Sequence, residues 1–134
     1  MKKMRVTALA VALISAACSS SSPPPPCNEN PWECASGQTC WPKDAQNFAC
    51  LNSGPGKAGD ACQNSIDSPT CGAGLACLQT SAAGGTCTPY CDPASSAHGC
   101  AGGQICTLVA LGGAGGALFH ACYGGGTAAD SGTD

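Results

Sequence analysis

CGAGLAC, residues 71–77, is the stretch that decides the fold, because the chain repeats its pattern as CASGQTC at 34–40 and as CAGGQIC at 100–106. In each stretch two cysteines enclose five residues with a glycine at the centre. One further cysteine precedes each stretch and another follows it, so a unit of four cysteines occurs three times. This repetition indicates three tandem modules, at residues 27–50, 62–87 and 91–122. Their cysteines are Cys27, Cys34, Cys40, Cys50, Cys62, Cys71, Cys77, Cys87, Cys91, Cys100, Cys106 and Cys122.

Apolar side chains alone are too few to hold the modules together. Residues 27–122 contain fourteen large ones, about five per module. Each contributes about 1.5–3 kcal/mol when buried, whereas each ordered residue loses about 1–2 kcal/mol of backbone entropy. A disulfide that closes a loop of about 15 residues contributes on the order of 3 kcal/mol. We therefore predict a small disulfide-rich fold with short β-hairpins and little regular secondary structure.

Zinc is the other common reason for clustered cysteines, and the spacing does not favour it. Structural zinc sites use cysteines with two residues between them, whereas the closest pair here, Cys87 and Cys91, has three. His98 and His120 are solitary, and we interpret both as solvated loop or hairpin positions. We predict no metal and no cofactor.

Short catalytic motifs are missing from the sequence: there is no GxSxG, no GxxxxGK and no HExxH. Asp60, Asp67 and Asp92 lie in loops rich in Gly, Pro or Ser, where aspartate usually stabilises a turn. A cysteine nucleophile would require one of the module cysteines to stay unpaired. We therefore predict no enzymatic activity and no catalytic residues.

The central glycines, Gly37, Gly74 and Gly103, suit a tight turn with positive φ, after which the chain should return as a hairpin to the fourth cysteine. We place the outgoing and returning segments at 41–42 and 47–50 in the first module, and at Leu78 and 86–87, around a turn at 84–85, in the second.

The third hairpin is longer, with strands expected at 107–111 and 117–120 around the sequence GGAGG. Both strands are apolar on both faces. The hairpin either packs on a neighbouring module or forms an exposed ridge for binding.

The first 17 residues are typical of a bacterial signal peptide, with a basic start followed by an apolar run of about a dozen residues. ISAAC followed by SSSS resembles a lipoprotein signal, in which Cys18 becomes the lipidated first residue of the mature chain. Ser15 replaces the usual leucine, and residues 15–17 also suit the ordinary signal peptidase. Lipidation would leave an even number of cysteines, since 13 less Cys18 is 12. Its acyl chains, such as palmitate, would anchor the protein in the membrane.

Composition shifts divide the rest of the chain. Residues 18–26, with four prolines, form a tether after the lipidated cysteine. Residues 51–61, rich in Gly and Pro, form a linker that we interpret as a hinge, and 123–134 form a disordered tail. The mature chain keeps Lys43 and Lys57 against eight Asp and Glu, a net charge of 2 − 8 = −6. This charge argues against nucleic acid as a partner.

The spacing C-x6-8-C-x5-C-x9-C resembles the first four cysteines of an EGF-type module, although the following C-x-C is missing. In that family the first cysteine pairs with the third and the second with the fourth. The resemblance therefore implies crossed bonds, Cys27 with Cys40 and Cys34 with Cys50 in the first module. The sequences CGAGLACLQTSAAGGTC and CAGGQIC are also similar to the Dickkopf-type N-terminal cysteine-rich region and to cysteine-rich lipoproteins of myxobacteria. These resemblances imply an extracellular binding module.

Three functions are compatible with these features. The first is an outer-membrane lipoprotein, facing the periplasm or the cell surface, whose modules bind an envelope protein or a glycan. The second is a structural envelope component without a discrete ligand. The third is a small protease inhibitor with residues 41–49 as its inhibitory loop and Lys43 as its specificity residue.

Overall fold

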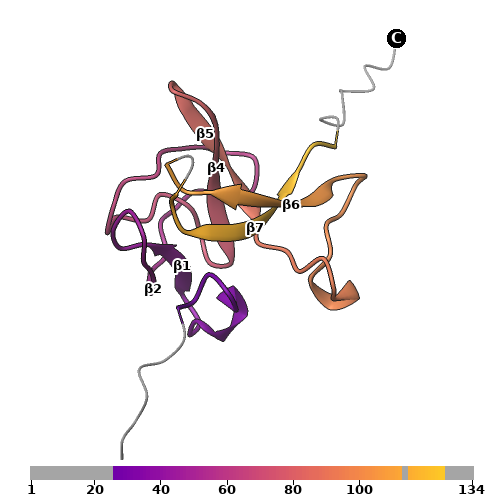
Figure 1. The fold of residues 1–134 in the computed structure, drawn as a ribbon, viewed down its shortest axis with the longest axis horizontal. Helices are drawn as coiled ribbons and strands as arrows, with labels where there is room; N and C mark the ends of the chain where they lie inside the picture. Colours follow the sequence, from indigo (N-terminus) through magenta and orange to yellow (C-terminus); the bar gives the residue numbers. More distant parts are fainter. Residues whose placement is uncertain (1–25, 113–114, 126–134) are drawn as a thin grey trace, which may run out of the picture.

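The computed structural model describes residues 26–112 and 115–125. The predicted signal peptide, Cys18 and nearly all of the tether lie outside the described residues. Seven strands and two short 3-10 helices follow one another along the chain (Figure 1). They are η1 Pro31–Glu33, β1 Gln38–Pro42, β2 Phe48–Asn52, β3 Ala61–Cys62, β4 Leu75–Ser81, β5 Gly84–Pro89, η2 Ser96–His98, β6 Ile105–Ala110 and β7 Leu118–Tyr123.

Each predicted module contributes one antiparallel hairpin. β1 pairs with β2, β4 with β5 and β6 with β7, and β3 adds a short third strand beside β5. In every hairpin the third and fourth cysteines of the module stand opposite each other, Cys40 to Cys50, Cys77 to Cys87 and Cys106 to Cys122. The small disulfide-rich fold with short hairpins is confirmed.

The repeated glycine has the same conformation in all three modules. Gly37, Gly74 and Gly103 have φ values of 79°, 72° and 77°, a region in which residues with a Cβ are strained. A backbone hydrogen bond closes each turn, for example from Leu75 N–H to Gly72 O at 3.1 Å. The predicted glycine turn is therefore confirmed, and it begins the outgoing strand of every hairpin.

The turn predicted for the second hairpin is wrong. Residues 82–83 make the turn, whereas Gly84 and Gly85 lie inside β5. A Cβ on Gly85 would collide with the backbone of Leu78 on β4. Glycine is needed here for the close approach of two strands and not for the reversal of the chain.

The segment predicted to be a hinge between the first two modules makes backbone hydrogen bonds to the second module. Its first two residues, 51–52, belong to β2, and Ala61 begins β3. Between them, Gly54 N–H donates to Cys71 O at 2.8 Å and Gly56 N–H to Thr70 O at 3.0 Å. A Cβ on Gly56 would lie 2.6 Å from Thr70 O. The glycines let this segment pack directly on the second module, which fixes it in place.

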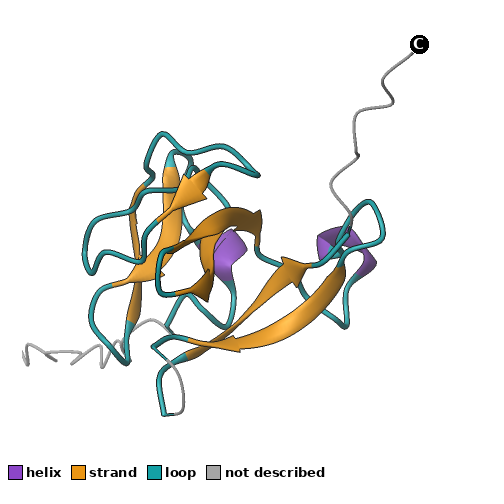
Figure 2. Ribbon diagram, turned by 90° about the horizontal axis from the view of Figure 1, so that it is seen from above, coloured by secondary structure: helices purple, strands orange, loops and turns teal. Residues whose placement is uncertain are grey.

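Two buried clusters hold the molecule together, and each draws on more than one module. One joins Trp41 of the first module to the four cysteines of the second. The other joins Phe48 of the first module to Tyr90 and to Phe119 of the third. The hairpins therefore pack around shared cores (Figures 1 and 2).

Candidate functional site

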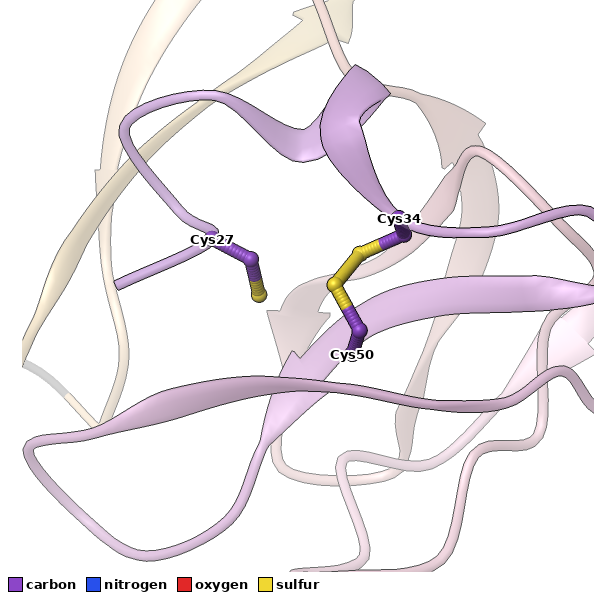
Figure 3. A group of neighbouring side chains, drawn as sticks. All are labelled: Cys27, Cys34 and Cys50. Carbon is purple, nitrogen blue, oxygen red and sulfur yellow. A yellow bond between two sulfur atoms is a disulfide. The ribbon is translucent and has the colours of Figure 1, made fainter. Parts of the chain in front are cut away.

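All twelve module cysteines form disulfides, and the pairing is the crossed one in every module. Because the third and fourth cysteines lie on opposite strands, each bond ties one strand of the hairpin to the segment that precedes the hairpin. Figure 3 shows the Cys34–Cys50 bond with Cys27 beside it. The bonds are Cys27–Cys40, Cys34–Cys50, Cys62–Cys77, Cys71–Cys87, Cys91–Cys106 and Cys100–Cys122.

The two disulfides of a module lie side by side. In each module the sulfurs of the first, second and fourth cysteines are all within 4.8 Å of one another. Such spacing would suit a metal ion only if the sulfurs were thiolates. Here they are bonded in pairs, so these clusters are the centres of the modules and not open ligand sets.

Buried polar side chains join the modules through hydrogen bonds to backbone carbonyls. Each bond satisfies a group that burial would otherwise leave without a partner, which would destabilise the fold by about 1–3 kcal/mol. The donors and acceptors are Thr39 Oγ1 to Leu75 O at 2.8 Å, Trp41 Nε1 to Ser65 O at 2.8 Å, Thr88 Oγ1 to Cys122 O at 2.7 Å, and Tyr90 Oη to Cys40 O at 2.6 Å.

Tyr90 lies where all three modules meet. It follows the second module, its hydroxyl reaches Cys40 in the first, and its ring packs edge-on against Phe119 in the third, with centroids 5.8 Å apart. Burial raises the pKa of the Tyr90 hydroxyl, because the phenolate would lose its hydration. The hydroxyl therefore stays a donor at any physiological pH and keeps its hydrogen bond to the first module.

A cleft of about 640 Å³ separates the hairpin of the second module from the end of the third. One side consists of Leu78 and Thr86 on β4 and β5. Across the cleft lie Gln104, just before β6, and Tyr123 at the end of β7. Its volume is in the range of pockets that hold small molecules, about 300–1,000 Å³.

The chemistry of this cleft is neutral. Among the residues that the structure describes, no Asp, Glu, Lys, Arg or His lines it; the polar groups of this lining are threonine hydroxyls, the Gln104 amide, the Tyr123 hydroxyl and the backbone. Tyr123 is 49 % exposed, which leaves part of its ring available to a ligand. Gly124 and Gly125, with φ of 73° and 77°, line the same cleft. The arrangement offers an aromatic surface flanked by donors and acceptors without charge.

The third hairpin resolves the alternative that the sequence left open, because its two faces differ. Phe119 and Leu111 are buried in the shared core, whereas Leu108 is 54 % and Leu118 50 % exposed. Directly opposite residues in a hairpin share a face, and the faces alternate from one pair to the next. Leu108 stands opposite His120, two pairs away from the Ala110–Leu118 pair, so Leu108 and Leu118 lie on the same face. One face therefore packs on the neighbouring modules, and the other presents leucine to solvent.

The structure corrects the interpretation of one histidine. His98 is half-buried and stacks on Trp32 of the first module, with ring centroids 3.9 Å apart and planes 17° apart. His120 is a half-buried hairpin residue on β7. His98 is thus a contact between modules and not a solvated loop residue.

The loop aspartates have the predicted structural role. Asp60 accepts a hydrogen bond from Lys57 N–H and Asp92 from Ala94 N–H, both at 2.8 Å. Asp67 has a φ of 56°, in the left-handed region that aspartate tolerates in turns.

Lys43, the residue proposed for protease inhibition, is exposed in a tight loop. Its N–H donates to Asn47 O at 2.8 Å, so the chain reverses within a few residues. Asp44 closes the loop by accepting from Gln46 N–H and Asn47 N–H. The hydrogen bond from the Asn47 side chain, helped by that from Gln46, lowers the pKa of Asp44. This loop is folded on itself instead of being extended.

Sequence reasoning missed Tyr123, which it assigned to the disordered tail. Tyr123 ends β7 opposite Ile105, so the tail begins later than predicted, and residues 126–134 lie outside the described residues. The cysteine pattern could have indicated that Tyr123 belongs to the hairpin. If Cys106 stands opposite Cys122, the next residue in each direction, Ile105 and Tyr123, must also be opposite.

No protein-family model matches this chain, and neither a curated protein nor a solved structure matches it. Among the described residues, no helix has the length and apolar character that crossing a membrane requires.

Proposed function

We propose that this protein is an exported, lipid-anchored binding protein of the bacterial outer membrane, which holds a neutral glycan of the cell envelope in the cleft between its second and third modules. The signal-like residues 1–17, Cys18 and the Ser/Pro tether support the location, since together they resemble a lipoprotein start. The observation that carries the binding function is the uncharged cleft of about 640 Å³ beside the exposed ring of Tyr123.

The composition of the cleft favours a sugar over an ionic ligand. A pyranose has an apolar face of C–H groups, which packs on an aromatic ring, and a rim of hydroxyls, which pair with amides and hydroxyls. Tyr123 supplies the ring, and Gln104, Thr80 and Thr86 line the cleft with such polar groups. An anionic sugar would find no cation in this lining.

The rigidity of the cleft supports the same function. Cys87 and Cys122, whose disulfides hold the second and third modules, both line it. Thr88 Oγ1, bonded to Cys122 O, ties its two sides together. A preformed site loses little conformational entropy when a ligand binds, which favours affinity.

The test is binding of the full mature chain to neutral and to sulfated oligosaccharides, by array and then by calorimetry. We expect saturable binding of a neutral oligosaccharide. Tyr123→Ala should weaken it at least about tenfold, whereas Tyr123→Phe, which keeps the ring, should weaken it less. Ile66→Ala is a matched control, since Ile66 is 50 % exposed and does not line the cleft. Absence of saturable binding, or equal affinity for Tyr123→Ala, would leave the structural envelope role as the better explanation.

The anchor is tested separately, by the intact mass of membrane-extracted protein alkylated with and without reduction. We expect a lipidated chain beginning at Cys18, with no alkylation before reduction and twelve alkylated cysteines after it, as six disulfides require. An unlipidated chain would contradict the anchor without bearing on the cleft.

A further inference from the structure

Among the described residues, no strand pairs with the outer edge of β6. β6, Ile105–Ala110, pairs with β7 on one side only. Leu111 N–H donates to Ala117 O at 2.9 Å, so Leu111 and Ala117 form a hydrogen-bonded pair, and every second pair from there is hydrogen-bonded as well. Because bonded and non-bonded pairs alternate in an antiparallel hairpin, the N–H and C=O groups of Cys106, Leu108 and Ala110 point away from β7. In Figure 2 the hairpin lies at the rim of the molecule, and no further strand lies beside its outer strand.

The outer edge of β7 has hydrogen-bond partners. They lie at the carbonyls that this alternation of bonded and non-bonded pairs directs outward. The carbonyls that point outward from β7 belong to Leu118, His120 and Cys122. They accept hydrogen bonds from Asn28 Nδ2 at 2.7 Å, Cys91 N–H at 3.2 Å and Thr88 Oγ1 at 2.7 Å.

Two other edge strands, β4 and β1, are capped in the same way. On β4, Leu75 O and Cys77 O accept from Thr39 Oγ1 and Asn64 Nδ2. On β1, Cys40 O accepts from the Tyr90 hydroxyl. Within the described ranges, the outward groups of β6 receive no such protein partner.

Within the described part of the chain β2 also lacks such caps, but four of its five residues are buried or half-buried. It exposes one residue, the polar Asn52. β6 instead exposes Ile105 at 63 % and Leu108 at 54 %.

The sequence of β6 does nothing to prevent pairing. Natural edge strands are usually protected by charge, proline, a bulge or short length. β6 reads ICTLVA, with no charged residue and no proline. Its ladder with β7 runs through six pairs without a register shift, whereas β4 and β5 shift between Gln79 and Ser81. An uncharged strand without a bulge and rich in β-branched residues is the type that recruits another strand.

We propose that β6 pairs with β6 of a second copy of this chain, antiparallel and centred on Leu108, to form a continuous four-stranded sheet. This register places Leu108 opposite its own counterpart, and Cys106 opposite Ala110 of the second copy. The outward groups on each strand then meet their complements, giving about six backbone hydrogen bonds, two for each bonded pair.

The side chains fit the same arrangement. Directly opposite residues lie close enough to pack, so the exposed Leu108 would cover its counterpart across the twofold axis. Leu118, two ladder pairs away on the same face, would flank this contact. A second copy of this chain fits the edge of β6 better than a charged partner does, because β6 contains no ionised side chain that would attract a charged partner.

The experiment is sedimentation velocity of the full mature chain, with Cys18→Ser to keep it free of detergent, from micromolar to millimolar concentration. We expect a monomer–dimer equilibrium. Leu108→Pro removes the outward N–H at the centre of the seam without removing a bond to β7, and proline is tolerated at strand edges. It should weaken dimerisation at least about tenfold, the effect of about 1.4 kcal/mol. Ile66→Lys, at a position of similar exposure, should leave the equilibrium unchanged.

Two measurements distinguish edge pairing from simple contact of apolar faces. Leu118→Lys changes the exposed apolar face of the hairpin but leaves the backbone groups at the edge of β6 intact. It should therefore weaken dimerisation less than Leu108→Pro. Amide hydrogen exchange should be slowed in the dimer at Cys106, Leu108 and Ala110, and should return to the free rate on dilution. Disulfide content by mass checks that each variant is folded.

Three results would overturn the proposal. These are a monomer at every concentration, a dimer that Leu108→Pro leaves intact, and edge amides that exchange equally fast in the dimer and the monomer. If the monomer instead bound peptides through the β6 edge, the edge would serve strand addition to another protein, and self-association would be wrong.

Discussion

The second and third modules have the same cysteine framework up to their third cysteine, and they differ in the hairpin that follows. Nine residues separate Cys77 from Cys87, whereas fifteen separate Cys106 from Cys122. The shorter hairpin gains a third strand, and its outer carbonyls are capped by side chains. The longer hairpin reaches the rim of the molecule, with its outer edge unpaired and two leucines exposed.

This comparison separates what the disulfides do from what the hairpins do. Both modules have crossed bonds and the same glycine turn. The segment between the third and fourth cysteines can therefore change in length without changing the framework. In the second module this segment has its outer carbonyls capped, whereas in the third one face packs in the shared core and the other exposes two leucines.

The largest expected effect comes from removing one disulfide of either module. Replacing Cys71 and Cys87 together by alanine should lower the free energy of unfolding by about 5 kcal/mol, and replacing Cys100 and Cys122 by about 3 kcal/mol. Loop-closure entropy alone gives the opposite order by about 0.3 kcal/mol, since the loops span 16 and 22 residues. Packing decides the order, because Cys71 and Cys87 are almost wholly buried with Trp41. Denaturant unfolding measures both variants, and a greater loss from the third module would contradict the comparison.

The two tryptophans of the first module allow the packing of the second and third modules to be compared, because each tryptophan packs against one of them. Trp41 is fully buried against the second module, and its Nε1 donates to Ser65 O. Trp41→Ala should destabilise the protein by about 3–5 kcal/mol. Trp32 is half-buried and stacks on His98 of the third module, so Trp32→Ala should lower stability by on the order of 1–2 kcal/mol. Thermal unfolding of the two variants side by side checks the order; equal losses would mean that the third module is packed as firmly as the second.

The glycine turns should show no difference between the modules. Gly74→Ala and Gly103→Ala each place a Cβ in open space but at positive φ, so each should lower stability by about 1–2 kcal/mol through backbone strain alone. Gly85→Ala is the contrasting variant, because its Cβ would meet the Leu78 backbone, and it should cost more than either. Unequal effects at Gly74 and Gly103 would show that the turns are not equivalent.

The smallest effect is expected in the first module, at Asp44, whose folded pKa is lowered chiefly by the Asn47 side chain. A lowered pKa means that the carboxylate stabilises the fold above the ordinary aspartate pKa, and that this contribution is lost as pH falls through the folded value. Asp44→Asn should therefore melt slightly below the unmodified chain at neutral pH, and the gap should close on acidification. A gap in melting temperature that widened in acid would contradict the assigned cause.

Much of the local structure could be predicted from particular residues. Gly37, Gly74 and Gly103 indicated the turns, because only glycine adopts positive φ without strain. The third and fourth cysteines of each module indicated where hairpins begin and end. The prediction failed for Gly85 and Gly54, where glycine allows close approach to another segment, which local sequence does not reveal.

The candidate sites could be predicted only in part. The apolar residues 107–111 and 117–120 pointed to the third hairpin, but not to which face would be buried, since both faces are apolar. The cleft beside Tyr123 needs residues from two modules, and the capped and open edges depend on donors as distant as Asn28 from Leu118. No pattern within one module contains that information.

The sequence by itself determined the number of modules, the disulfide-rich class and the glycine turns, because cysteine spacing and the absence of a Cβ act locally. Only the tertiary structure decided that Tyr90 joins all three modules, that residues 51–61 are packed, and that β6 is left open. These outcomes depend on which buried carbonyl each side chain reaches. Such contacts are set by the packing of the modules against one another and not by the spacing within any of them.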